Sequence, residues 1–370
     1  MSKRAKIILY SITGFFTFLY ILIGSIAYYC VFNTKIDWDA FEKKFSYIAS
    51  FFSGPNVPVE EQKQNKGKPK EELDEMKMIL EKTAKESEIR FEEAKKWNKK
   101  MYEENKVEEV EITSFDNLKL KGYLYKTENF EDNNRFALLA HGYNADHTCH
   151  YDNIKDFYDL GFNVLIIDER AYGKSEGTYT SLGWKERIDV KDWAWYLAKR
   201  FPKSQIITWG ISMGSATVML SCAENMPKNF KLCIADCGYN SFYDLLYYLC
   251  GHTMGLPSFL TVFVLSSTSL IAKLRHKTNI KFSVQNALKK AKVPILFFHG
   301  DSDTFVPLEN AKKMYDSYKN HHELVITKYA GHCCSYILDH DKYIESIKNF
   351  TETYLESKQL DVSTFVETNI

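Results

Sequence analysis

Short, unbroken apolar runs alternate with helical patterns after residue 107, and this alternation constrains the fold more than any other feature. The runs are Phe136–Ala140, Asn163–Ile167, Gln205–Trp209, Leu232–Ala235, Ile295–Phe298 and Leu324–Lys328. Unbroken apolar strands between helices are typical of a parallel sheet that is buried on both faces. Two alternating segments precede them, Val107–Phe115 and Leu118–Tyr125, and the Asp116–Asn117 junction between them predicts an antiparallel hairpin. The sequence therefore predicts an α/β domain over residues 107–357, with an eight-stranded, mostly parallel sheet and helices on both faces.

An uncharged, mostly apolar run of 26 residues, Ile7–Phe32, lies near the N-terminus and follows three basic residues. About 20 residues in a helix span the hydrocarbon core of a bilayer. A cleaved signal peptide is the alternative, but the bulky Tyr28 and Tyr29 stand where a cleavage site has small residues. We therefore predict a single-pass anchor in the cell membrane over residues 1–32. The preceding basic residues favour a cytoplasmic N-terminus and an extracytoplasmic globular domain.

Residues 33–106 are expected to form juxtamembrane helices and a linker. An apolar stripe at helical spacing consists of Trp38, Phe41, Phe45, Ile48 and Phe52. Gly54–Lys70 holds three prolines among charged residues and is typical of a flexible linker, and Glu71–Met101 predicts a charged helix. Residues 358–370 are expected to be a C-terminal tail. The sequence also predicts that a chain starting near Lys70 retains activity without the anchor.

Composition excludes several classes of function. Lys+Arg and Asp+Glu both number 48, so the formal net charge is zero and nucleic-acid binding is not expected. Eight cysteines in 370 residues are too few for a disulfide scaffold. They show no metal-ligand spacing, and the chain has no Gly-rich phosphate loop or dinucleotide fingerprint. We therefore predict neither a metal nor a cofactor.

The strongest chemical signal is Gly210-Ile211-Ser212-Met213-Gly214, directly after the run that ends at Trp209. This G-x-S-x-G pattern places a serine on a sharp strand-to-helix turn, where the two glycines allow neighbouring backbone to approach closely. In open α/β sheets, ligands bind beyond the carboxyl ends of the strands. Ser212 is therefore the predicted nucleophile, and the backbone N–H of Met213 is the first predicted oxyanion donor.

A serine nucleophile needs a base and a carboxylate that orients the base. His332 follows the last predicted strand and Asp303 follows the strand before it. Asp236 is the alternative acid, because it ends a strand nearer the nucleophile. The loop after Phe136–Ala140 is expected to supply the second oxyanion donor through the backbone N–H of Tyr143.

These segments together resemble the α/β-hydrolase superfamily over residues 107–357. Asp168–Ser175 resembles its D-x-R-G-x-G-x-S loop, with Ala171 in place of one glycine, and His299–Asp303 resembles its H-G-x-x-D turn. Asp236–Tyr239 resembles a subgroup of membrane-anchored or secreted bacterial hydrolases described as serine-aminopeptidase-like or cinnamoyl-esterase-like. The resemblance implies cleavage of esters, thioesters or peptides, and a structural role for the Asp168–Ser175 loop.

Nearly sixty residues separate Asp236 from Pro294, where this superfamily places a cap, and the cap is expected at about 239–292. Its apolar segments, Tyr243–Leu249 and Leu260–Leu265, predict helices that line an acyl pocket. The alternatives are that they pack only on the body or contact the membrane. The pocket interpretation favours a small hydrophobic substrate.

The sequence thus predicts a membrane-anchored serine hydrolase that cleaves an ester or thioester through an acyl-enzyme, with Ser212, Asp303 and His332 as its triad. A carboxylesterase or thioesterase is favoured over the alternative, a serine peptidase or aminopeptidase. An alternative of another class is a non-catalytic binding or scaffold protein on a hydrolase fold.

Overall fold

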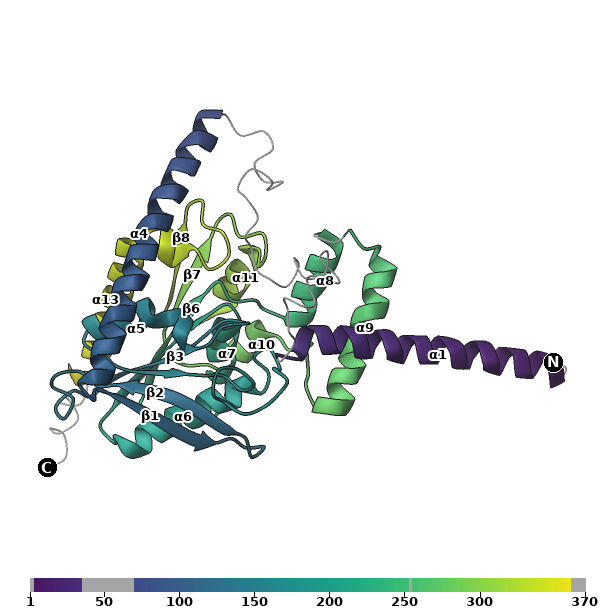
Figure 1. Ribbon diagram of the computed structural model, residues 1–370, viewed down its shortest axis with the longest axis horizontal. Helices are drawn as coiled ribbons and strands as arrows, with labels where there is room; N and C mark the ends of the chain where they lie inside the picture. The colour runs from purple at the N-terminus through teal and green to yellow at the C-terminus, as the bar shows by residue number, and fades with distance from the viewer. Residues whose placement is uncertain (1–2, 35–69, 253–254, 361–370) are drawn as a thin grey trace, which may run out of the picture.

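The computed structural model describes residues 3–34, 70–252 and 255–360, in which eight strands form one sheet in the order β1-β2-β4-β3-β5-β6-β7-β8 (Figure 1). The strands are β1 (Val107–Thr113), β2 (Lys119–Tyr125), β3 (Arg135–Ala140), β4 (Asn163–Ile167), β5 (Gln205–Ile211), β6 (Phe230–Asp236), β7 (Ile295–Gly300) and β8 (His322–Thr327). β3 to β8 run parallel to their neighbours in this group, while β1–β2 and β2–β4 are antiparallel pairs. The predicted mostly parallel, eight-stranded sheet is confirmed. The predicted apolar stripe at 38–52 and the linker before Lys70 lie outside the described residues.

Both faces of the sheet are covered by helices, which explains the unbroken apolar runs. Leu138 and Ala140 of β3 point into one apolar core, and the alternating Ala137 and Leu139 point into the other. The first core is closed by α6 (Glu186–Arg200), α7 (Met213–Ser221), α10 (Val284–Leu288) and α11 (Glu309–Ser317). The second is closed by α4 (Lys70–Glu103), α5 (Tyr151–Asp159), α12 (Ser335–Leu338) and α13 (His340–Leu360).

The strand order reverses at β3, because β4 lies on one side of it and β5 on the other. Loops that leave the carboxyl ends of β3 and β5 therefore separate and leave a crevice between them, which is where open α/β sheets bind ligands. The insertion between β6 and β7 contains α8 (Phe242–His252), α9 (Ser258–His276) and α10. In Figure 1, α8 and α9 stand away from the sheet beside α1 (Lys3–Phe32), the long purple helix.

The C-terminal end of α1 is part of the globular body. Tyr28 and Phe32 are buried, and the Thr180 N–H donates a 3.0 Å hydrogen bond to the Phe32 carbonyl. Farther back, α1 lies so close to α9 that a Cβ on Gly24 would be 2.7 Å from the Ser267 backbone. The sequence-based interpretation of a separable anchor missed this packing, because an apolar helix has the same pattern whether it meets lipid or protein.

Both helices carry exposed apolar side chains. Within the described part of the chain, α9 is long and apolar enough to cross a membrane, with 33% of that stretch buried. α1 contributes the shorter apolar stretch Thr17–Tyr29. The exposed apolar residues of the two helices are Phe18, Ile21, Leu22, Ile26 and Tyr29 on α1, and Phe259, Val262, Leu270 and Leu274 on α9.

Candidate active site

Ser212 lies on the sharp turn between β5 and α7, with φ 55° and ψ −113°. A non-glycine residue is strained in this conformation, and such strain is concentrated at functional sites. The two flanking glycines are sterically required. A Cβ on Gly210 would lie 2.3 Å from the Gly214 carbonyl oxygen, and one on Gly214 would lie 2.2 Å from the Ala140 carbonyl oxygen. The turn therefore presents the serine hydroxyl at the carboxyl end of β5.

Three of the residues singled out in the sequence form a continuous hydrogen-bonded array. Oγ of Ser212 lies 2.8 Å from Nε2 of His332, and Nδ1 of His332 lies 2.8 Å from Oδ2 of Asp303. The other oxygen of Asp303 accepts hydrogen bonds from the N–H groups of Phe305 and Val306, at 2.9 and 2.8 Å. All three array residues are buried. With the imidazole neutral, Nδ1–H donates to Asp303 and Nε2 accepts from the serine, which is the arrangement of a general base.

Asp236, the alternative acid, belongs to a different network. Its Oδ2 accepts a 3.0 Å hydrogen bond from Tyr343, whose hydroxyl accepts one of 2.9 Å from the Trp209 indole. The Asp236 carbonyl accepts from the Ser212 N–H at 2.9 Å, so its backbone supports the nucleophile turn. Burial raises the pKa of its carboxyl to about 7. Of the two candidate acids, only Asp303 is hydrogen-bonded to His332 in the described residues.

The environment of His332 favours its charged form. Burial of the imidazole acts to lower the pKa of His332, and the neighbouring Asp303 carboxylate acts to raise it. The carboxylate prevails, and the pKa lies well above the ordinary histidine value. The array is therefore suited to stabilising an imidazolium that forms when His332 takes a proton from Ser212.

The loop after β3 lies directly beside the nucleophile. A Cβ on Gly142 would be 3.6 Å from the Cβ of Ser212. The next residue, Tyr143, lines the same cavity as Met213 at the start of α7. The hydroxyl of Tyr143 donates a 2.8 Å hydrogen bond to the carbonyl of Val31 in α1.

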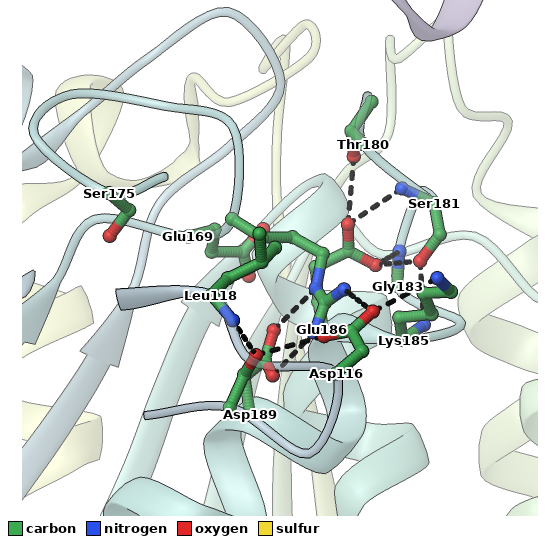
Figure 2. Close-up of polar contacts among 12 residues, drawn as sticks. Asp116, Leu118, Glu169, Ser175, Thr180, Ser181, Gly183, Lys185, Glu186 and Asp189 are labelled. Carbon is green, nitrogen blue, oxygen red and sulfur yellow. Dashed lines mark hydrogen bonds and ion pairs between the residues drawn. The ribbon is translucent and has the colours of Figure 1, made fainter. Parts of the chain in front are cut away.

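Arg170 of the Asp168–Ser175 loop is at the centre of a partly buried ion-pair network, which includes Asp116, Lys185 and Asp189 (Figure 2). Arg170 makes two hydrogen bonds to Asp189, at 2.6 and 2.7 Å, and two to Asp116, at 2.9 and 3.1 Å. Lys185 also reaches Asp116, at 3.1 Å. None of these four residues lines the cavity. The network links the loop to α6 and to the β1–β2 hairpin, which is a structural role.

A neighbouring carboxylate shapes one wall of the cavity. Glu186 accepts hydrogen bonds from the Thr180 hydroxyl at 3.0 Å and from the N–H groups of Ser181 and Gly183 at 2.7 and 3.0 Å (Figure 2). The turn that it organises places Leu182 at a φ of 55° and directs this residue to the cavity lining.

A cavity of about 360 Å³ opens next to Ser212 and His332. Most of its lining is apolar, and α8 provides much of it. The apolar lining includes Val31, Leu182, Phe242, Leu245, Leu246 and Phe305. Among the described residues, no aspartate or glutamate lines it. Such a cavity suits an uncharged acyl group.

Sequence reasoning missed several cavity residues. Val31 was assigned to the anchor, and Leu182 and Phe305 lie in loops without a distinctive pattern. The sequence feature that could have identified Phe305 as a cavity residue is its position two residues after Asp303. No local signal identified Val31, because its place in the cavity depends on where α1 ends against the body.

Two cysteines lie next to the array. The sulfur atoms of Cys237 and Cys333 are 3.5 Å apart, and they and a ring nitrogen of His332 lie within 4.8 Å of one another. These atoms could bind a soft metal ion by their chemistry. Both ring nitrogens of His332 already have partners, so a metal bound here would displace Ser212 or Asp303. The geometry therefore favours the hydrogen-bonded array over a metal centre.

Comparison with known proteins agrees with this architecture. Residues 149–358, more than half of the chain, match the prolyl oligopeptidase family. The uncharacterized protein YqkD of Bacillus subtilis is 26% identical over 256 residues, covering 68% of this chain and 83% of YqkD. The lysophosphatidylserine lipase ABHD12 of Danio rerio is 24% identical over 205 residues, covering 51% of this chain and 48% of the relative.

The structure of the Pyrococcus furiosus esterase Pf2001 is similar, with a TM-score of 0.54 and 28% identity. The alignment covers 67% of this chain and 92% of the esterase. The chain therefore shares an esterase-like α/β-hydrolase fold, and the part outside the alignment includes sequence that the esterase lacks.

Proposed function

The chain belongs to the prolyl oligopeptidase family, and from this premise we propose that it is a serine hydrolase that cleaves ester or thioester bonds through an acyl-enzyme intermediate. The observation that carries this proposal is the unbroken hydrogen-bonded array from Ser212 through His332 to Asp303, at 2.8 Å for each step, beside an apolar cavity. An inactive scaffold on the same fold has no requirement for that array, so its geometry favours an enzyme over a binding protein.

In the proposed mechanism, Ser212 attacks the acyl carbon while His332 takes its proton. Asp303 orients the imidazole and stabilises the imidazolium. The backbone N–H groups of Met213 and Tyr143 stabilise the oxyanion that develops on the acyl oxygen. His332 then returns the proton to the leaving group. Water next attacks the acyl carbon while His332 takes its proton, and His332 gives this proton to Oγ of Ser212 as the bond to the acyl group breaks and the carboxylic acid leaves.

The cavity favours an ester or thioester over a peptide substrate. An aminopeptidase must bind a free α-ammonium group, which calls for a carboxylate close to the scissile bond. The described cavity lining has no aspartate or glutamate. A peptidase remains the alternative because of the family to which the chain belongs. The esterase and lipase relatives agree with the ester assignment.

We further propose that the protein is a single-pass membrane protein with an extracytoplasmic hydrolase domain. Residues 1–32 are the anchor, residues 33–106 connect it to the hydrolase domain at 107–357, the cap spans about 239–292 and residues 358–370 are a tail. The exposed apolar side chains of α1, such as Phe18 and Ile26, support burial of this helix in lipid. Extraction of membranes with carbonate tests the anchor, because a spanning helix remains in the pellet. Protease treatment of intact cells tests the orientation.

Labelling of the full-length protein with a fluorophosphonate tests the hydrolase proposal. A serine hydrolase is labelled, and the Ser212→Ala variant is not. A panel of p-nitrophenyl esters, acyl thioesters and aminoacyl p-nitroanilides then distinguishes the substrate classes. Turnover of the anilides in preference to the esters would support the peptidase. Absence of both labelling and turnover would support a non-catalytic protein.

A further inference from the structure

The last turn of α1 forms part of the cavity that faces Ser212. Val31 lines this cavity and is buried, although it belongs to the apolar run that predicts a membrane anchor. The neighbouring Phe32 is fully buried, and its ring packs edge-to-face on Phe242 of α8 with centroids 6.1 Å apart. Phe242 lines the same cavity. One wall is therefore made jointly by the anchor helix and the cap.

The same turn also contacts the loop that is proposed to stabilise the oxyanion. The last four carbonyls of an α-helix have no partner within the helix. Val31 is in this group, and its carbonyl accepts the 2.8 Å hydrogen bond from the Tyr143 hydroxyl. The backbone N–H of Tyr143 is one of the two proposed oxyanion donors. The end of α1 thus contacts the residue that provides this donor.

Several contacts hold this end of α1 in one position. The Thr34 N–H donates to the Thr178 carbonyl at 3.1 Å, and the Thr34 hydroxyl donates to the Ala171 carbonyl at 2.7 Å. Asn33 forms an isolated β-bridge with Tyr179. On the other side, the Tyr28 ring stacks on His276 of α9 with centroids 4.8 Å apart. These contacts act on both sides of Val31, so its position is set by the folded body.

We propose that the C-terminal end of α1, the helix proposed to anchor the protein in the membrane, forms part of the active site. In this inference, which rests on the proposed hydrolase function, Val31 is a specificity-determining residue that limits the length of the acyl group. The side chain of Tyr143 is a positioning residue, which ties the oxyanion loop to the end of α1. An acyl chain that extends from Ser212 across the cavity meets the Val31 side chain, so the volume at position 31 sets how many carbons fit.

The test for Val31 compares p-nitrophenyl acetate, butyrate, octanoate and laurate, using the full-length protein in detergent. Val31→Phe places a larger side chain in the cavity and leaves less room for the acyl chain. We therefore expect at least about a tenfold loss of kcat/KM on octanoate relative to acetate. Val31→Ala enlarges the cavity at this position and is expected to shift the preference toward the longer esters. Ile26→Phe is the matched control, because Ile26 is an exposed apolar residue of the same helix that does not line the cavity. Equal effects on all four esters, or a profile like that of Ile26→Phe, would overturn the role of Val31.

The test for Tyr143 uses Tyr143→Phe, which removes only the hydroxyl that bonds to Val31. Oxyanion stabilisation acts in the transition state, so we expect kcat to fall about tenfold while KM for acetate stays within about twofold. A structural role alone would lower the fraction of folded protein, which titration with fluorophosphonate measures. An unchanged kcat per titrated site would refute the positioning role.

Binding experiments separate this inference from the proposed function. Ser212→Ala retains the cavity without turnover, and displacement of a fluorescent fatty acid by butyrate, octanoate or laurate measures acyl length directly. Length selectivity that changes with Val31→Phe in this background supports the inference even if no ester is hydrolysed. Hydrolysis by the wild type with a selectivity independent of residue 31 supports the proposed function and refutes the inference.

Discussion

Nδ1 of His332 lies 2.8 Å from Oδ2 of Asp303, although the two residues are 29 positions apart in the chain. They follow β8 and β7, which are adjacent parallel strands, so their carboxyl ends bring the two loops together. Asp236 is the last residue of β6 and is hydrogen-bonded to Tyr343 instead. The two candidate acids thus differ in the side chain to which each carboxylate is hydrogen-bonded.

Replacement of the two acids by asparagine should rank them. Asp303→Asn leaves His332 without its anionic partner and favours the wrong tautomer, so we expect a loss in kcat of up to about 10⁴. Asp236→Asn should cost much less, because burial raises the pKa of that carboxyl to about 7 and an amide resembles its protonated form. Steady-state kinetics on one soluble ester, with near-UV circular dichroism as the folding control, measures both. The opposite ranking would transfer the role to Asp236.

Removal of the nucleophile should abolish chemistry without unfolding the protein. Ser212→Ala deletes one hydroxyl and is expected to lower kcat by about 10⁴ to 10⁶ and to eliminate fluorophosphonate labelling. Ser215→Ala is a matched control in α7, the helix that directly follows Ser212, because Ser215 is buried but does not line the cavity. Labelling of Ser212→Ala at the wild-type level would exclude this serine as the nucleophile.

The pH profile should report the charge of His332. The general base acts in its neutral form, and its pKa is raised above the ordinary value of about 6.5. We therefore expect kcat/KM to rise with pH along a limb whose midpoint lies above about 6.5. In Asp303→Asn the raising effect of the carboxylate is lost and burial lowers the pKa, so the limb should move to lower pH. An unshifted limb would show that another group controls the profile.

The raised pKa of His332 should also make the stability of the fold depend on pH. A group whose pKa is higher in the folded state stabilises the fold most at pH values below its unfolded pKa. The contribution of the His332–Asp303 pair should therefore be complete below about pH 6.5 and be lost as the pH rises through the folded pKa. Denaturant titrations of the wild type and Asp303→Asn at several pH values should converge as the pH rises. Divergence with rising pH would contradict this coupling.

Truncation should reveal how far the hydrolase domain depends on α1. A chain that starts at Lys70 lacks Val31 and Phe32, so the cavity loses one wall and the Tyr143 hydroxyl loses its partner. We expect its kcat/KM per titrated site to fall at least about tenfold on octanoate relative to acetate. A chain that starts at Thr17 is the control, because it keeps the end of α1 that packs on the body. Full activity of the Lys70 chain on all esters would support the separable anchor predicted from the sequence.

The buried ion pair between Arg170 and Asp189 should be important for stability. Arg170→Met leaves the Asp189 carboxylate buried without its partner, which typically costs about 3 to 5 kcal/mol of unfolding free energy. Lys174→Ala, in the same loop, removes an exposed pair with Glu109 and should change little. Urea unfolding monitored by tryptophan fluorescence compares the two variants. Similar midpoints would argue that a water or another residue compensates for Arg170.

Much of the fold and of the arrangement of the candidate site was predictable from the sequence, because the relevant signals are local. The run Asn163–Ile167 predicts a strand buried on both faces, and β4 has these bounds in the structure. The G-x-S-x-G pattern identifies the turn at Ser212, because only glycine fits the close contacts at positions 210 and 214. Chain order after the strands likewise indicated His332 as the base.

Only the tertiary structure determined which partners the residues of the candidate site contact. An apolar side chain such as Val31 has the same sequence pattern whether it faces lipid, a protein core or a cavity, and its place beside Ser212 depends on where α1 ends against the body. Asp236 ends β6 and Asp303 follows β7 at the same edge of the sheet, and their side-chain contacts distinguish them. Periodicity and steric requirements act over a few neighbouring residues and are readable in sequence, whereas contacts between distant segments arise only when the chain packs.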